Sequence, residues 1–209
     1  MRRFMQIFFY LLYHPFAFAY DLVAAIVSFG HWTSWAAETI PFIQGTRILE
    51  IGHGPGHLQR RLLDLKVDAV AIDESAQMGM LAKRRLGHSH KLTRGLAQHL
   101  PFADNSFHTV VSTFPTDYIF HAQTLSEISR CLATEGRLVV LPVATPKNSA
   151  LKRLYRATGE TQSDLNEALK SKLTQPFIQA GFETETQIIE VKSSSLLIVV
   201  AKRPMRHDG

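Results

Sequence analysis

Cysteine is nearly absent from the sequence, since Cys131 is the one thiol in 209 residues. A single cysteine excludes an internal disulfide and a zinc site built from several cysteines, and it fits a reducing, cytoplasmic compartment. Internal repeats and low-complexity segments are missing as well. With 45% hydrophobic and 20% charged residues, the composition is that of one folded globular domain rather than a disordered chain.

Acidic residues are outnumbered by basic ones, which gives a net charge of +5 and a pI near 9.5. This balance permits an anionic partner such as a nucleic acid or a membrane surface. The basic residues are scattered in short groups, however, as on solvated helix faces. We expect no nucleic-acid partner and no metal site, and the oligomeric state does not follow from the sequence.

The N-terminal segment Phe4–Tyr20 has no charged side chain and is rich in aromatic residues. It is short for a membrane span and is interrupted by His14-Pro15. Residues 17–19 resemble a signal-peptide cleavage site, which keeps export open. We favour helices that cover the sheet or a substrate pocket, with peripheral membrane contact through residues 1–18 as the alternative.

Short apolar segments alternate with helical ones over the middle of the chain. The pattern predicts strands followed by helices, and uniformly apolar strands are typical of a parallel sheet buried on both faces. The expected strands are Arg47–Ile51, Ala69–Asp73, Lys91–Arg94, His108–Ser112 and Leu138–Pro142, and the helices lie at 57–65, 76–86 and 122–132.

The last two segments, 183–191 and 195–202, are too close together for a parallel crossover and predict an antiparallel hairpin. The whole is an α/β fold, a Rossmann-like doubly wound sheet of seven strands, mostly parallel, with N-terminal helices added. We predict a single domain over 1–209, with a helical cover at 1–44 and the core at 45–209.

A glycine-rich turn follows the first expected strand in the sequence RILEIGHGPGHL, and contains Gly52, Gly54 and Gly56. Glycines allow backbone angles that other residues avoid and let the chain lie close to a nucleotide-like ligand. The dinucleotide fingerprint G-x-G-x-x-G would need a glycine where His57 stands. The turn therefore indicates a nucleotide-like ligand other than a dinucleotide.

Asp73 ends the second expected strand, with Glu74 beside it. A carboxylate there faces the crevice at the carboxyl ends of the strands and can accept hydrogen bonds from both ribose hydroxyls. A helix N-cap or a surface acid is the alternative interpretation. Together with the glycine turn, ribose binding is the stronger hypothesis.

Three segments carry a family resemblance. E-I-G-x-G-x-G from Glu50, Asp73 and the run Leu100–Phe107 before a strand resemble class I S-adenosylmethionine-dependent methyltransferases. The segment from Tyr20 to Trp35 is similar to one in the ubiquinone/menaquinone C-methyltransferase group. The resemblance implies S-adenosylmethionine as the cofactor and methyl transfer as the reaction.

The resemblance also implies binding roles, which cover the methionine, ribose and adenine parts of the cofactor. Tyr20 would lie near the methionine carboxylate, the turn would line the methionine, and Thr113 would face the methyl group. Leu96 stands where the family often has aspartate, so adenine would rely on backbone groups and apolar packing. The implied cofactor-binding residues are Tyr20, Glu50, Gly52, His53, Gly54, Gly56, Asp73, Glu74, Leu96, Ala97 and Thr113.

Methyl transfer from a sulfonium depends mainly on positioning, so a general base is optional. His53 lies inside the turn and is the candidate base, with a polar lining role as its alternative. The segment after the fourth strand, Thr113–Thr116, does not match the N-P-P-Y of amino-methyltransferases. This favours a small, lipophilic acceptor. A non-catalytic, membrane-associated cofactor-binding module and a nicotinamide-dependent oxidoreductase remain the alternatives.

Overall fold

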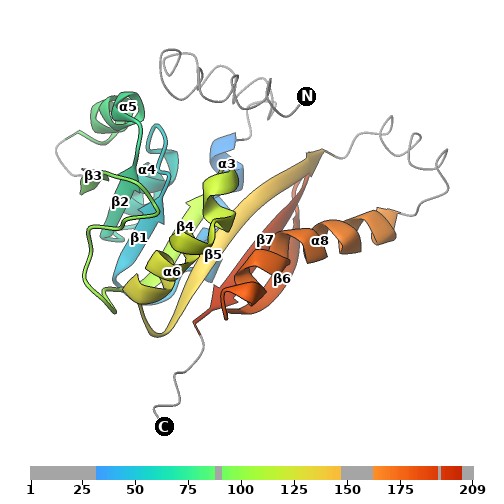
Figure 1. Cartoon of the computed structure of the whole chain (residues 1–209). Coiled ribbons are helices and arrows are strands. Elements are labelled where there is room, and N and C mark those ends of the chain that lie inside the picture. The colour runs from blue at the N-terminus through green and yellow to red at the C-terminus, as the bar shows by residue number, and fades with distance from the viewer. Residues whose placement is uncertain (1–31, 88–90, 147–161, 193, 204–209) are drawn as a thin grey trace, which may run out of the picture.

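The computed structural model describes residues 32–87, 91–146, 162–192 and 194–203. Its centre is a seven-stranded sheet with the strand order β3-β2-β1-β4-β5-β7-β6 (Figure 1). The order reverses between β1 and β4, as in doubly wound folds. The predicted fold class, a mostly parallel Rossmann-like sheet with a C-terminal antiparallel hairpin, is confirmed.

Five strands form the parallel part of the sheet, and their carboxyl ends meet at one edge. Each of these strands is rich in apolar residues and has at least four residues, except β3, which is shorter and forms an edge of the sheet. They are β1 (Ile48–Ile51), β2 (Ala69–Asp73), β3 (Leu92–Arg94), β4 (Phe107–Thr113) and β5 (Leu132–Pro146).

The C-terminal hairpin consists of β6 (Glu183–Glu190) and β7 (Ser194–Lys202), and β7 runs antiparallel to both β5 and β6. The expected fifth strand, Leu138–Pro142, is much shorter than the observed β5. β5 is longer because it pairs with β7 as far as Pro146, beyond the end of its pairing with β4 at Leu141.

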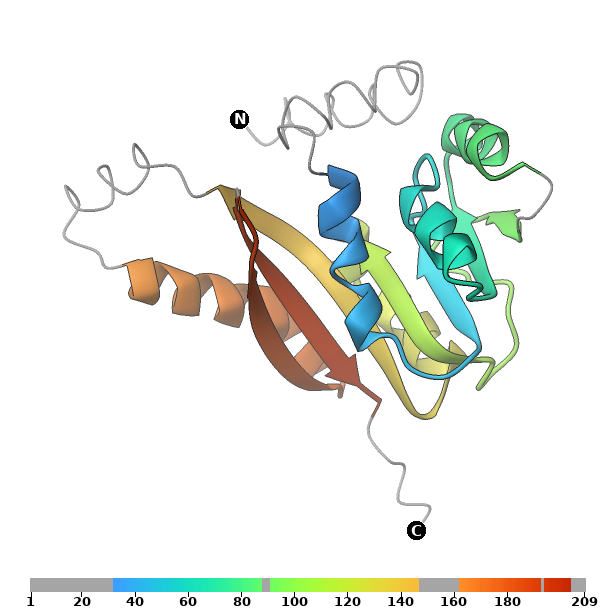
Figure 2. The ribbon, with the colours of Figure 1, turned by 180° about the vertical axis from the view of Figure 1, so that it is seen from behind.

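Helices cover both faces of the sheet (Figures 1 and 2). α3 and α4 lie on the face seen in Figure 2, whereas α6 and α8 lie on the opposite face. α5 packs against β2 and β3 and also contacts α4. The helices are α3 (Trp32–Ala37), α4 (His57–Asp64), α5 (Ala76–Leu86), α6 (Ala122–Cys131) and α8 (Gln162–Gln179), with short 3-10 helices η2 (Ile40–Phe42) and η3 (Asp117–Phe120).

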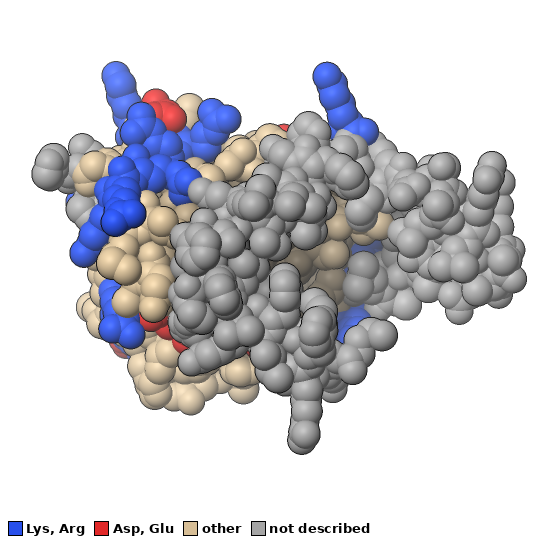
Figure 3. Space-filling model, turned by 90° about the horizontal axis from the view of Figure 1, so that it is seen from above, with Lys and Arg blue, Asp and Glu red and all other residues tan. Residues whose placement is uncertain are grey.

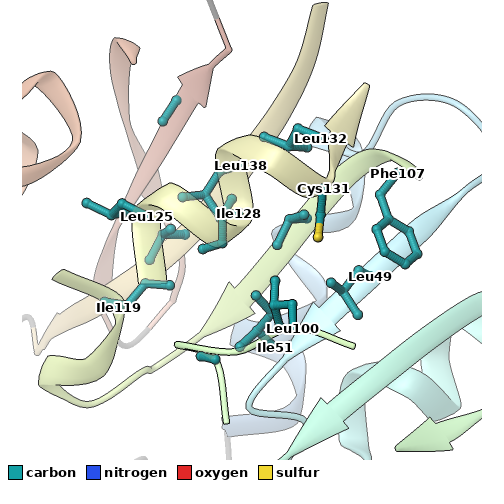
Figure 4. Packing of buried hydrophobic residues seen from close by; sticks show 14 of the residues in the cluster. Leu49, Ile51, Leu100, Phe107, Ile119, Leu125, Ile128, Cys131, Leu132 and Leu138 are labelled. Atoms are coloured by element: carbon teal, nitrogen blue, oxygen red, sulfur yellow. The ribbon is translucent and has the colours of Figure 1, made fainter. Parts of the chain in front are cut away.

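The core consists of two clusters, one on each face of the sheet. Successive residues of a strand point to opposite faces, so Leu49 joins one cluster and Ile48 the other. Figure 4 shows the first cluster, in which Leu49 and Ile51 lie opposite Ile128 of α6. Burial on both faces explains why the central strands read as continuous apolar runs.

No helix among the described residues is long and apolar enough to cross a membrane. Residues 1–31 lie outside the described part of the chain, so the predicted helical cover at 1–44 is represented here by α3 and η2 alone. The division of the chain into one domain with this cover stays a prediction.

Candidate functional site

The glycine turn connects β1 to α4 and has left-handed backbone angles at each of its glycines. The φ angles are +73° at Gly52, +51° at Gly54 and +81° at Gly56. A Cβ at Gly52 would collide with the hydroxyl of Tyr118, and one at Gly56 would come within 3.1 Å of the Cβ of Ala82. Glycine is therefore required here both by backbone conformation and by close packing.

Asp73 lies beside this turn because β1 and β2 are parallel neighbours that end at the same edge. Its Oδ2 accepts a 2.8 Å hydrogen bond from the backbone N–H of Gly54, and its Oδ1 accepts one of 2.8 Å from Ser75. Ser75 in turn caps α5 by accepting from Met78 N–H at 3.2 Å. The predicted ribose-binding carboxylate and the glycine turn are thus in direct contact, and Ser75 takes the N-cap role.

Glu50 is a buried acid at the end of β1. Its Oε2 accepts a 2.8 Å hydrogen bond from the side-chain amide of Gln59 on α4. Burial raises the pKa of Glu50 to about 8, the Gln59 hydrogen bond lowers it in part, and the nearby Asp73 raises it further. The carboxyl group therefore holds its proton at neutral pH unless a positive charge arrives beside it.

His53 is also buried, within the turn itself. Its Nδ1 lies 2.6 Å from the carbonyl oxygen of Gly54, and because a carbonyl can only accept, Nδ1 carries the proton. Desolvation lowers the pKa of His53, while the charge of Asp73 raises it in part. The ring is therefore neutral at pH 7, and its Nε2 is a hydrogen-bond acceptor.

Tyr118 of η3 reaches the end of β1, a contact that no pattern in the sequence predicts. Its hydroxyl donates a 3.3 Å hydrogen bond to the carbonyl of Ile51 and lies 3.1 Å from the Oγ of Ser112, which donates to the same carbonyl at 2.8 Å. Tyr118 and Ile51 are 67 residues apart. Only the pairing of β1 with β4 brings them together, and no local motif signals it.

A small cavity of about 20 Å³ opens at the turn. It gathers Glu50, Gly52, His53, Gly54 and Thr113 from the predicted set, and α3 contributes Ala36. The complete lining is Ala36, Glu50, Gly52, His53, Gly54, Pro55, His57, Leu58 and Thr113.

The remaining predicted residues lie outside this cavity. Ala97 is buried and Leu96 is 46% exposed in the segment that follows β3. Glu74 has an exposed side chain, and its carbonyl accepts a hydrogen bond from the guanidinium of Arg94. Tyr20 lies outside the described residues.

A larger groove of about 550 Å³ lies between α6 and α8. Its lining combines Phe120 and Leu125 with Ser126, Arg130 and Gln179. No residue of the glycine turn borders it, so its size alone does not make it the candidate site. Within the described ranges, no three His, Cys, Asp or Glu side chains lie close enough together to hold a metal ion.

The site lies in a Rossmann-like fold, and a family model matches the part of the chain that carries it. Residues 49–140 match the family model for a methyltransferase domain. This match agrees with the resemblance to class I S-adenosylmethionine-dependent methyltransferases drawn from the motifs.

The chain is similar to named members of the quinone group. It is 30% identical over 148 residues to a ubiquinone/menaquinone biosynthesis C-methyltransferase of Geotalea uraniireducens, covering 65% of this chain and 63% of the relative. It is 29% identical over 193 residues to a demethylmenaquinone methyltransferase of Thermotoga maritima, covering 89% and 79%. The chain thus spans less than two thirds of the length of the first of these relatives.

A solved structure of an S-adenosylmethionine-dependent methyltransferase from Thermotoga maritima has the same fold. The TM-score is 0.64 at 19% identity, with 93% of this chain and 99% of that chain covered. The likeness covers most of this chain and supports the fold described above.

Proposed function

We propose that this protein is an S-adenosylmethionine-dependent methyltransferase that acts on a small, lipophilic acceptor. The observation that carries the proposal is the contact between Gly54 N–H and Asp73 Oδ2. It joins a glycine-rich turn to a carboxylate at the carboxyl ends of two adjacent parallel strands. That arrangement matches the two demands of an adenosine-containing ligand, close backbone approach and a ribose acceptor.

The residues at the site fit the proposed cofactor. A Cβ at Gly54 would meet no atom within 4 Å, so the turn leaves open space on the ligand side. Each Asp73 oxygen accepts one backbone hydrogen bond and keeps a lone pair for a ribose hydroxyl. Glu50 would give up its proton when a cationic group of the cofactor arrived beside it, and would then supply negative charge to that group, while Asp73 would face the ribose.

In this proposal the binding residues divide the cofactor between them. The turn from Gly52 to Gly56 holds the methionine part, with Tyr20 near its carboxylate. Asp73 and Glu74 hold the ribose, and Leu96 and Ala97 flank adenine. Thr113, which borders the turn cavity, faces the acceptor.

When bound, S-adenosylmethionine supplies an electrophilic methyl group on its sulfonium. The protein's own task is to hold the acceptor atom in line with that methyl group and to exclude water. His53 can take a proton from an acidic acceptor through Nε2, since its Nδ1 proton is engaged with Gly54. The neutral state of the imidazole suits this role.

The acceptor class rests on two supports. The segment after β4 lacks the N-P-P-Y of amino-methyltransferases, and two relatives are named for quinone biosynthesis. A quinol-like ring is therefore the first acceptor to test. We further propose a cytoplasmic protein, with peripheral membrane contact through residues 1–18 as a prediction that concerns residues outside the described ranges.

Calorimetry with S-adenosylmethionine and its demethylated product tests the first half of the proposal. We expect saturable binding of both, and an absence of heat on folded protein would overturn it. Incubation with labelled S-adenosylmethionine and a panel of quinols tests the second half. Binding without transfer to any acceptor would favour the non-catalytic module.

A further inference from the structure

The outward face of α5 combines basic and apolar side chains. The helix buries Met78, Ala82 and Leu86, at intervals of four residues, against the sheet side. The opposite face carries Met80, whose side chain is 56% exposed, together with the exposed residues Lys83 and Arg84. Because residues three and four apart are neighbours on a helix, these three side chains form one patch, which we call the α5 face.

The stretch of sequence that contains the α5 face carries charge of one sign. From 75 to 103 the sequence has lysine and arginine but no aspartate or glutamate. Lys91 pairs with Asp68, and Arg94 binds a backbone carbonyl. In the described part of the chain, Lys83 and Arg84 make no ion pair, so their charges face solvent uncompensated. Figure 3 shows lysine and arginine gathered at one end of the molecule seen from above, with few acidic side chains among them.

The α5 face lies next to the candidate site. The backbone of Gly56 approaches Ala82 of α5 closely, and the guanidinium of Arg85 donates a hydrogen bond to the carbonyl of Pro55. Figure 1 shows α5 above the ends of β1 and β2, on the side to which the glycine turn belongs. A surface that met α5 would therefore lie near the glycine turn.

We propose that the α5 face docks on an anionic lipid bilayer. Lysine and arginine near such a surface each strengthen attachment by about fivefold. Met80, beside Lys83 and Arg84 on the same helix face, can enter the boundary between head groups and acyl chains, as apolar residues of interfacial helices do. A nucleic acid would also attract the two charges, but it offers nothing apolar to Met80. The bilayer fits both parts of the face.

Docking deepens the proposed function, because a lipophilic acceptor dissolved in the bilayer would lie beside the glycine turn. The inference itself stands on exposure and charge. Vesicle binding is measured without S-adenosylmethionine, so a negative result leaves methyl transfer untouched, and a failure of cofactor binding leaves docking untouched.

Co-sedimentation of the full chain with vesicles tests the inference. We expect binding to phosphatidylcholine vesicles that contain phosphatidylglycerol, none to phosphatidylcholine alone, and loss of binding as salt rises from about 0.1 M to about 1 M. Lys83→Gln/Arg84→Gln should weaken binding by about 25-fold. Met80→Gln should weaken it at unchanged net charge.

The matched control is Lys170→Gln/Lys172→Gln on α8, which removes the same charge far from α5 and should leave vesicle binding unchanged. Thermal melting of every variant reports its folding. The proposal is overturned if wild type ignores anionic vesicles, if it binds both vesicles equally, or if the α5 variants bind as wild type does. It is also overturned if Lys83→Gln/Arg84→Gln abolishes binding to RNA while vesicle binding persists.

Discussion

Gly54 donates its backbone N–H to Asp73 Oδ2 at 2.8 Å, across the 19 residues that separate them in the chain. The other oxygen of Asp73 accepts from Ser75 at the start of α5. The Asp73 carboxylate thus holds both the glycine turn and the first residues of α5 in place. Since the same carboxylate is the proposed ribose acceptor, its loss should affect the fold and the affinity for the cofactor at once.

Asp73→Asn should raise the Kd for S-adenosylmethionine by about 10-fold to 100-fold, since a hydrogen bond to a charged group contributes about 1.5–3 kcal/mol. Isothermal calorimetry measures this. Asp64→Asn is the control, because Asp64 forms an exposed ion pair with Arg60 on α4 and should change affinity little. Unchanged affinity in Asp73→Asn would remove the ribose assignment.

Glu50→Gln should make the fold more stable in alkali. The pKa of Glu50 in the fold is about 8, above its ordinary 4.5. Folding favours the neutral form of Glu50. The contribution of Glu50 to the free energy of unfolding is therefore complete below pH 4.5 and is lost as pH rises to about 8. Glutamine stays neutral, so its stability advantage should grow across that window, by at most about 1.4 kcal/mol per pKa unit.

The same substitution should weaken binding of the cationic cofactor, because glutamine cannot supply the negative charge that a sulfonium and an ammonium group favour. Thermal melting from pH 5 to pH 9 and calorimetry at pH 8 measure the two effects. A stability difference that does not vary with pH would contradict the buried-acid argument.

His53→Gln should lower kcat by about 100-fold for an acidic acceptor, measured at saturating cofactor because His53 also lines the turn. Burial lowers the pKa of His53, so wild-type activity should fall as the ring gains its proton at acid pH, and the variant should lack that fall. His99→Gln is an exposed histidine control. If His53→Gln retained wild-type turnover, His53 would be a polar lining residue.

Gly52→Ala and Tyr118→Phe should be strongly non-additive. Alanine at 52 would clash with the Tyr118 hydroxyl and sit at φ +73°, which costs about 1–2 kcal/mol by itself. Phenylalanine removes the clashing oxygen and, with it, a hydrogen bond that contributes about 1 kcal/mol. Gly52→Ala should therefore destabilise less in the Tyr118→Phe background. Urea unfolding of the four proteins measures the coupling, and simple additivity would contradict it.

The sequence predicts the elements whose signals are local. The bounds of β2 (Ala69–Asp73) and α5 (Ala76–Leu86) agree with expectation, because their signals, a short apolar run and the Ser75 cap, lie within a few residues. The contacts of Gln59 with Glu50 and of Tyr118 with Ile51 were not predicted. Each depends on a helix or strand that the fold brings from elsewhere in the chain, and polar partners of this kind leave no periodic pattern.

The position of β7 has a consequence for the order in which the protein is completed during synthesis. β7 is the last of the described strands in sequence, yet it lies between β5 and β6 in the sheet. In the described sheet, β6 pairs with β7 alone, so β6 leaves the ribosome before its partner exists. Truncation before Ser194 should therefore leave nascent chains with one exposed edge along β5, and such chains should depend on chaperones until the final strand inserts.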